Sequence, residues 1–281
     1  MSLQADYDKK MTLIDSILLS EKRHRVIESL FCSDKTQKQL ERSLKVQWNL
    51  LKGPVKHLKD EEFIIQDGKK YSLSKIGRIM YENTLPLLDM VETFSKNPDY
   101  WISRDLSSVP KYLAKSIGKM KDCSVYVPRP DHMFEPLMEL FSETYKAVDL
   151  PKRNIKICLV LFYSKTLDVL LEQMEQGCHI SLILAKHVYD RMLKEFKDQL
   201  KFLLESENVD IFVFNENKLI PQITITDIKV LIIFFNQKKK YDYHELLSYD
   251  KSTLAWATEL FSYYKQRSEH ITLLSTGLCD K

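Results

Sequence analysis

The residues that could do chemistry gather in one stretch of the chain, between positions 38 and 70. Lysine and arginine neutralise phosphate groups, and asparagine or glutamine can form two hydrogen bonds with an adenine edge. The alternative is an ordinary solvated surface, with Trp48 packed into a core. We predict a surface for double-stranded DNA made by Lys38, Arg42, Gln47, Trp48, Asn49, Lys52, Lys56, His57, Lys59, Lys69 and Lys70.

The common catalytic and metal-binding patterns are missing from the sequence. The chain has six glycines, and the closest pair, Gly68 and Gly77, lies nine positions apart. This spacing excludes the GxGxxG, P-loop and GxSxG motifs, which need closer glycines. The five cysteines form no CxxC pair and the seven histidines are scattered, so neither a disulfide framework nor a zinc site is expected. We predict no catalytic residues, no metal and no cofactor.

Three polar residues farther along the chain are candidates for a ligand pocket. Tyr163 and Ser164 follow one predicted strand, and His187 follows the next. Ligands of α/β sheets bind in the crevice outside the carboxyl ends of the strands. The alternative is structural, because Ser164 could be the N-cap of a helix and His187 could simply begin one.

The elements that position the basic stretch have the order of a winged helix-turn-helix. Ser20 is a suitable N-cap for the second of two short helices. Asp67-Gly68 between apolar residues is a strong hairpin signal. Pro54 interrupts the helical pattern, and we expect the helix to start again at Gly53-Pro54. The expected elements are helices at 11–18, 20–32 and 36–44, a break at 45–47, a helical segment through Leu51, Val55 and Leu58, and a hairpin at 63–74.

Beyond residue 121 the pattern changes to apolar strands alternating with helices, which indicates a sheet buried on both faces. The expected strands are 124–127, 155–162, 180–185, 209–214, 223–226 and 230–235, and the expected helices are 134–147, 165–176, 187–205 and 251–269. The fold class is therefore α/β (mixed α+β overall), with an N-terminal winged helix-turn-helix joined by a helical linker to an α/β sheet domain.

The net charge also differs between the N-terminal part and the rest of the chain. The whole chain of 281 residues has a formal charge of +3, whereas residues 1–80 alone carry +5. A basic part joined to a mildly acidic remainder suggests domains with different partners. We predict a DNA-binding domain at 1–85, a helical or irregular linker at 86–121 and a sensor or dimerisation domain at 122–281.

Two helices are candidates for a homodimer interface, which would match a palindromic operator. One is the Met- and Leu-rich helix at 75–95, which Pro86 should kink or divide. The other is the final helix, where Trp256 and Tyr263 lie off the apolar stripe.

Several sequence blocks together resemble a known family. They are LIDSILLSEKRHRVIESL, VKHLKDEEFIIQDGKKYSLSKIGRIM, DYWISRDLSSVP, GCHISLILAKHVYDRMLKEF and YDYHELLSYDKSTLAWATELFSYYKQRSEHI. In order and coverage they are similar to the archaeal, ArsR-like winged-helix transcriptional regulators related to the methanogenesis regulatory proteins. The resemblance covers most of residues 12–271, and Ala257 departs from the glycine usual in the family.

The resemblance implies a cytoplasmic DNA-binding regulator whose second domain senses a small molecule, binds a regulatory protein or forms a dimer. It implies tolerance of proline in the recognition segment, no enzymatic activity and no metal. The second domain also looks distantly like a phospholipase-D-type half-domain, although the region VFNENKLIPQITITD lacks the HxK pair. The alternative is therefore a hydrolase-type enzyme with an N-terminal adaptor. No apolar run is long enough for a membrane span, and we expect no membrane partner.

Overall fold

The computed structural model describes residues 20–127 and 153–276. The chain divides into two compact units, residues 1–88 and 89–281, and each is described by itself. The helices expected at 11–18 and 134–147 lie outside the described residues. The three-part division into domain, linker and domain stays a prediction.

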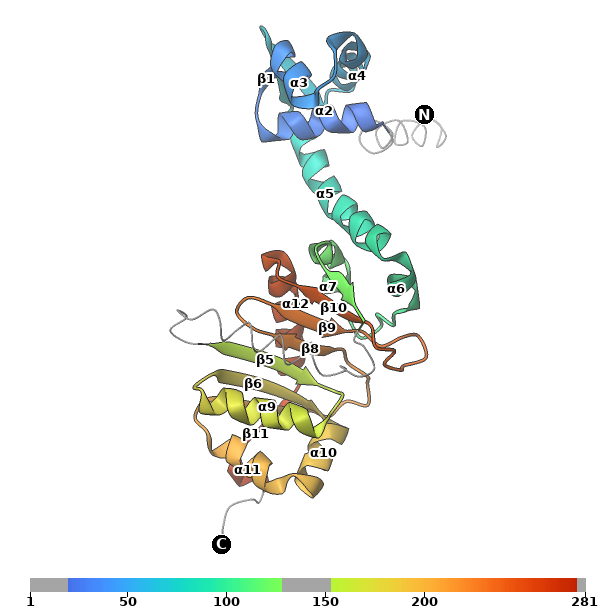
Figure 1. The fold of residues 1–281 in the computed structure, drawn as a ribbon. Coiled ribbons are helices and arrows are strands. Elements are labelled where there is room, and N and C mark those ends of the chain that lie inside the picture. Colours follow the sequence, from blue (N-terminus) through green and yellow to red (C-terminus); the bar gives the residue numbers. More distant parts are fainter. Residues whose placement is uncertain (1–19, 128–152, 277–281) are drawn as a thin grey trace, which may run out of the picture. The chain divides into compact units, whose positions relative to one another are not determined.

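The first unit is a bundle of helices with a small antiparallel sheet (Figure 1). Its strand order is β1-β3-β2. The helices followed by the β2–β3 hairpin confirm the winged-helix arrangement. The elements are α2 (Glu21–Cys32), β1 (Lys35–Thr36), α3 (Gln37–Leu44), α4 (Trp48–Asp60), β2 (Ile64–Asp67), β3 (Lys70–Leu73) and α5 (Lys75–Lys96), which continues into the second unit.

Local sequence signals account for the ends of these elements. The Ser20 side chain accepts a hydrogen bond from the Arg23 amide at the start of α2, as an N-cap should. Thr36 and Gln39 form a capping box at the start of α3, which satisfies two otherwise free amides. Lys45 ends α3 with a φ of 53°. Gly68 has a φ of 56° in the wing turn, where glycine has no steric penalty.

Pro54 lies inside α4, so the prediction that the helix restarts there is wrong. Proline also restricts the residue before it, through contact with that residue's Cβ. Gly53 has no Cβ, so this restriction is relaxed. Leu51 and Val55, on either side of the proline, are both buried in the same core, and their burial stabilises one continuous helix.

The first unit has its own hydrophobic core. Its packing is close enough that a Cβ on Gly77, at the start of α5, would lie 2.1 Å from the Phe63 carbonyl oxygen. The buried residues are Val26, Ile27, Leu30, Leu40, Leu44, Leu51, Val55, Leu58, Phe63, Ile64, Tyr71, Leu73 and Tyr81.

The second unit is built on an eight-stranded mixed sheet of order β11-β7-β6-β5-β8-β9-β10-β4. Strands β5, β6 and β7 are parallel and the other pairs are antiparallel. The strands are β4 (Ser124–Tyr126), β5 (Asn154–Leu159), β6 (His179–Ala185), β7 (Val209–Phe214), β8 (Gln222–Ile225), β9 (Val230–Ile233), β10 (Glu245–Ser248) and β11 (Glu269–Ile271).

Helices lie on both faces of this sheet, with α9 on one face and α12 on the other (Figure 1). The expected mixed α/β class is confirmed. The helices are α6 (Pro98–Ser103), α7 (Lys111–Ala114), η2 (Ile117–Met120), α9 (Ser164–Glu175), α10 (Lys186–Glu195), α11 (Lys197–Glu205), α12 (Lys251–Lys265) and α13 (Leu273–Thr276).

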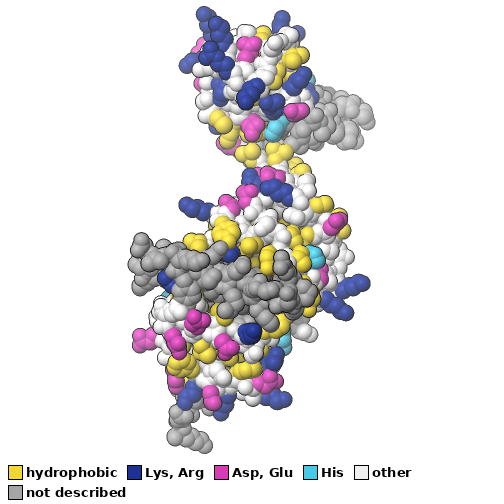
Figure 2. Space-filling model, viewed as in Figure 1, with side chains coloured by type: hydrophobic (Ala, Val, Ile, Leu, Met, Phe, Trp, Pro, Cys, Tyr) yellow, Lys and Arg dark blue, Asp and Glu magenta, His cyan; other side chains and the backbone are white. Residues whose placement is uncertain are grey.

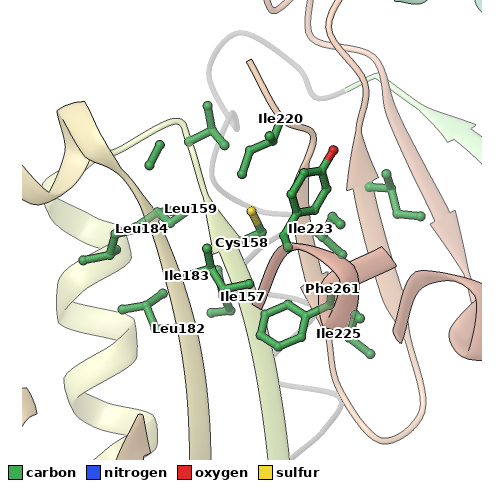
Figure 3. Packing of buried hydrophobic residues seen from close by; sticks show 14 of the residues in the cluster. Ile157, Cys158, Leu159, Leu182, Ile183, Leu184, Ile220, Ile223, Ile225 and Phe261 are labelled. Atoms are coloured by element: carbon green, nitrogen blue, oxygen red, sulfur yellow. The ribbon is translucent and has the colours of Figure 1, made fainter. Parts of the chain in front are cut away.

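One part of the core of the second unit lies between α12 and the sheet. Figure 3 shows Phe261 of α12 beside Ile157 of β5 and Ile225 of β8. Trp256 is fully buried, and its indole Nε1 donates to the Leu113 carbonyl oxygen at 3.0 Å. The prediction that Trp256 could extend an interface is therefore wrong, because its only polar atom and its ring are both used in the core.

Part of the predicted linker belongs to this core. Tyr100, Trp101, Leu113, Ile117 and Met120 are buried among the residues that pack on the sheet. Their apolar side chains are spaced irregularly, so no helical or strand period indicated this burial from the sequence.

Candidate nucleic-acid interface and ligand pocket

The exposed side of α4 carries four of the eleven residues predicted to bind DNA. Asn49, Lys52, Lys56 and Lys59 are all exposed, at spacings of three or four residues, which places them on the side of the helix that does not pack on the core. Gln47, at the N-cap, is exposed as well. This face offers polar groups for base edges at its start and ammonium groups along its length.

Trp48 and His57 are placed differently from these residues, because both are half-buried. The Trp48 ring packs on Tyr71 of β3, with 5.8 Å between ring centroids. Trp48 therefore has a structural contact, the alternative that the sequence left open, and its share in binding DNA stays a prediction.

The start of α4 is fixed by a carboxylate from the preceding helix. Glu41 Oε1 of α3 accepts a hydrogen bond from the Trp48 amide at 2.7 Å. A negative group at a helix N-terminus satisfies a free amide and interacts favourably with the helix dipole. Glu41 is the single acidic residue between Lys35 and Lys59, a stretch with seven Lys and Arg residues. This role of Glu41 was not predicted from the sequence, although an acidic residue seven positions before a helix start is visible there.

Further basic residues flank α4 on both sides. Lys38 and Arg42 of α3 are exposed, as are Lys69 and Lys70 of the hairpin. Figure 2 shows Lys and Arg side chains gathered at the top of the first unit.

A hydrogen-bonded link connects the end of α4 to the hairpin. Lys59 Nζ donates to Gln66 Oε1 at 2.8 Å, and Gln66 Nε2 donates to the Gly68 carbonyl oxygen at 3.0 Å. A groove of about 550 Å³ lies between α3 and the hairpin and is lined by Lys38 and Lys69 among others. The structure thus places basic groups from α3, α4 and the hairpin within one unit.

In the second unit, a pocket of about 460 Å³ lies at the carboxyl ends of β5, β6 and β7. His187 lines it, and its Nε2 lies 2.9 Å from the Val160 carbonyl oxygen. Lys186 in the wall forms an ion pair with Asp190. The described lining contains no serine, threonine or cysteine, and its ionisable side chains include Lys186, His187 and Asp190.

Tyr163 and Ser164 do not line that pocket, so the structure separates them from His187. Tyr163 is the N-cap of α9 and Ser164 its first residue, one position earlier than the sequence suggested for the cap. Burial, together with nearby Tyr243 and Glu245, raises the pKa of Tyr163. Glu245 was missed from the sequence because β10 itself was not recognised.

Other kinds of site find little support in the residues that the structure describes. Across residues 20–127 and 153–276, no three His, Cys, Asp or Glu side chains lie close enough to hold a metal ion. Cys32, Cys123, Cys158 and Cys178 are free thiols. No helix of this part of the chain has the length and apolar character that a bilayer crossing requires.

Comparison with known proteins shows a similarity in the second unit. Residues 133–267 match the family described as "Methanogenesis regulatory protein FilR1, middle domain". This stretch is similar to a FilR1 middle domain. The match confirms the resemblance inferred from the sequence blocks.

A whole protein with this domain is similar to the chain over a longer range. The methanogenesis regulatory protein FilR1 of Methanothrix harundinacea (strain 6Ac) is 22% identical over 219 residues, which cover 75% of this chain and 47% of that protein. The chain thus spans about half of the length of FilR1.

Two experimental structures overlap with the chain at low scores. The archaeal chromatin protein TrmBL2, described with a novel mode of DNA binding, has a TM-score of 0.42 at 13% identity, over 93% of this chain and 99% of that one. The phosphatidylserine synthase of Haemophilus influenzae Rd KW20 has a TM-score of 0.40 at 13% identity, over 57% and 41%. Both scores lie below 0.5, a level at which an overlap does not establish a common fold.

Proposed function

We propose that this protein is a sequence-specific, DNA-binding transcriptional regulator of the ArsR-like winged-helix type. The observation that carries the proposal is the exposed face of α4, where Asn49, Lys52 and Lys56 follow one another without an acidic side chain between them. The similarity to FilR1, a methanogenesis regulatory protein, supports a regulatory role.

In this proposal α4 is the recognition helix and enters the major groove. Gln47 and Asn49, at its start, contact base edges, where a bidentate amide discriminates by about 1–3 kcal/mol. Lys52 and Lys56 neutralise phosphates along the helix. The hairpin lysines, Lys69 among them, contact the adjacent backbone or minor groove.

A salt titration tests the nucleic-acid surface. The log of affinity for duplex DNA should fall linearly with log salt, by about 0.9 for each phosphate that is neutralised. Replacing Lys56 and Lys69 together with alanine should weaken binding to specific and random duplexes alike and reduce the slope by about 2. Lys194→Ala, an exposed lysine on α10, is the matched control. Affinity that does not depend on salt would contradict the proposal.

A second variant separates base recognition from phosphate contact. Asn49→Ala should reduce the preference for the specific duplex by about 1–3 kcal/mol and leave the salt slope unchanged. Equal losses on specific and random DNA would show that Asn49 contributes only to general binding.

We also propose that the second unit gives the regulator its response. Its pocket at His187 is large enough for a small effector, and a regulatory protein is the other candidate partner. A homodimer would present two recognition helices to a palindromic operator. A cytoplasmic location follows from this role.

A further inference from the structure

A buried carboxylate in the second unit has only half of its hydrogen-bonding capacity used. Glu245, the first residue of β10, is 4% exposed. Its Oε1 accepts a hydrogen bond from the Tyr241 hydroxyl at 2.5 Å. Its Oε2 is buried and has no hydrogen-bond partner among the described residues. A buried polar atom without a partner is costly and calls for an explanation such as a missing ligand or water.

No basic side chain of the described residues neutralises this carboxylate. Arg104, whose side chain is also buried, forms an ion pair with Asp242 and donates to the Phe234 carbonyl oxygen instead. Burial raises the pKa of Glu245, and the hydrogen bond from Tyr241 only partly offsets it. The chain thus provides a buried acid and leaves its counter-charge to be supplied from elsewhere.

Several tyrosines lie near Glu245. The rings of Tyr241 and Tyr243 lie 4.8 Å apart at 49°, and Tyr163 is near enough to both, and to Glu245, for their charges to affect one another. Tyr126 of β4 is the register partner of Glu245, so its side chain projects from the same face of the sheet. Tyrosines from three separate segments therefore converge on one carboxylate.

The backbone of one of these tyrosines is held in an unfavourable conformation. Tyr243 has a φ of 60°, which is rare for a bulky residue. Such conformations persist where the surroundings enforce them and are concentrated at functional sites. In this conformation the Tyr243 ring lies against Tyr241 while its side chain stays partly exposed.

We propose that Glu245 and the tyrosines Tyr126, Tyr163, Tyr241 and Tyr243 bind an organic ammonium ion that keeps at least one N–H group. The N–H donates to Glu245 Oε2, and the positive charge is stabilised by the tyrosine rings through cation–π attraction. Under the proposed regulatory function this ligand would be an effector that binds outside the pocket at His187, and that role rests on the proposed function. The binding itself does not depend on it.

The test measures ligand binding to the full chain without DNA. Trimethylammonium chloride is the probe, and tetramethylammonium chloride, which has the same charge and no N–H, is its matched control. Isothermal titration should show saturable one-site binding of trimethylammonium and binding of tetramethylammonium weaker by about tenfold, the effect of losing one charge-assisted hydrogen bond. Potassium chloride at equal concentration should not compete.

Variants then assign the binding to this cluster. Glu245→Gln should weaken trimethylammonium binding by about tenfold or more, while Glu259→Gln, an exposed carboxylate on α12, should leave it unchanged. Tyr243→Phe keeps the ring and should bind as the wild type does, whereas Tyr243→Asn, which tolerates the same backbone, should bind about fivefold more weakly through loss of the ring.

Several results would overturn the proposal. One is the absence of saturable trimethylammonium binding by the folded protein, which would mean that Glu245 Oε2 is satisfied by a water or a proton. Another is an affinity for tetramethylammonium or potassium equal to that for trimethylammonium. The third is trimethylammonium binding that neither Glu245→Gln nor Tyr243→Asn changes. A protein that binds trimethylammonium and fails to bind any duplex would retain this site and refute the regulator instead.

Discussion

Arg104 of the second unit has a buried charged side chain, at 2% exposure. Its guanidinium pairs with both carboxylate oxygens of Asp242, donates to the Phe234 and Tyr100 carbonyl oxygens, and lies 4.5 Å from the Tyr100 ring centroid. A buried guanidinium tolerates the loss of water only while such partners remain. Asp242 thus holds the segment around α6 to the loop before β10.

Removing the Asp242 carboxylate should lower the stability of the protein. Asp242→Ala leaves Arg104 buried without its counter-charge, and we expect the free energy of unfolding to fall by about 3 kcal/mol. Urea unfolding measures the change. Glu259→Ala, which breaks the exposed pair with Lys119, should cost about 1 kcal/mol or less. Equal effects of the two substitutions would contradict the structural role of Asp242.

Because of the Arg104–Asp242 ion pair, the stability of the protein should depend on pH. Burial would raise the pKa of Asp242, but the hydrogen bond and charge of Arg104 outweigh it and the pKa is lowered. The stabilisation is therefore present above the ordinary pKa of an aspartate and is lost as pH falls through the lowered value. The Asp242→Ala variant should lose less stability than the wild type between these pH values.

At the scale of elements, the start of α4 depends on Glu41. Glu41→Ala removes the acceptor of the Trp48 amide and should lower the free energy of unfolding by about 1 kcal/mol. Glu41→Gln keeps a carbonyl oxygen for the same bond and should cost a few tenths of that. Urea unfolding of both variants distinguishes a capping role from a purely electrostatic one, for which the two losses would be equal.

Helix α5 is one of the two helices proposed for a dimer interface. Ile76, Ile79 and Leu87 are exposed on one stripe of it, and an uncovered apolar stripe is typical of a helix that packs on another. If this stripe forms the homodimer, Leu87→Glu should shift the mass in sedimentation analysis from dimer to monomer. Glu82→Lys, exposed on another side of the helix, should leave the mass unchanged. A dimer that survives Leu87→Glu would place the interface elsewhere.

The sequence predicted elements with strong periodicity or capping and missed those fixed by tertiary contacts. The N-cap Ser20 and the Asp67-Gly68 turn are local signals, and the structure confirms both. The continuity of α4 through Pro54 and the break at Phe196, whose φ is −136° between α10 and α11, depend on packing that local patterns do not encode.

The candidate sites likewise include residues that local sequence patterns predict and residues that only tertiary contacts bring together. The exposed lysines of α4 could be predicted because helical spacing places them on one face. His187 could be placed in a crevice because it follows a strand. Glu245 could not, since the four-residue strand β10 lies among tyrosines and charged residues that mask its alternation. The tyrosines near it also come from three segments that are far apart in the chain, at positions 126, 163 and 241–243.

At the scale of the molecule, the two units have separate hydrophobic cores with no residue in common. Units with separate cores unfold as separate cooperative transitions unless a large interface couples them. We expect calorimetry to resolve two transitions. Leu51→Ala should lower one midpoint and Leu182→Ala the other, each at a cost of about 2–5 kcal/mol. A single transition that both variants shift would show coupled units.

The outermost strands of the described sheet, β11 and β4, are three residues long. Unpaired main-chain groups at a sheet edge are the usual template for runaway association, and here another chain could add a ladder of three residues at most. Contact between copies would then depend on side chains, so single substitutions should be able to strengthen, weaken or redirect this contact. They could not do so for a ladder of main-chain hydrogen bonds, which does not depend on the side chains.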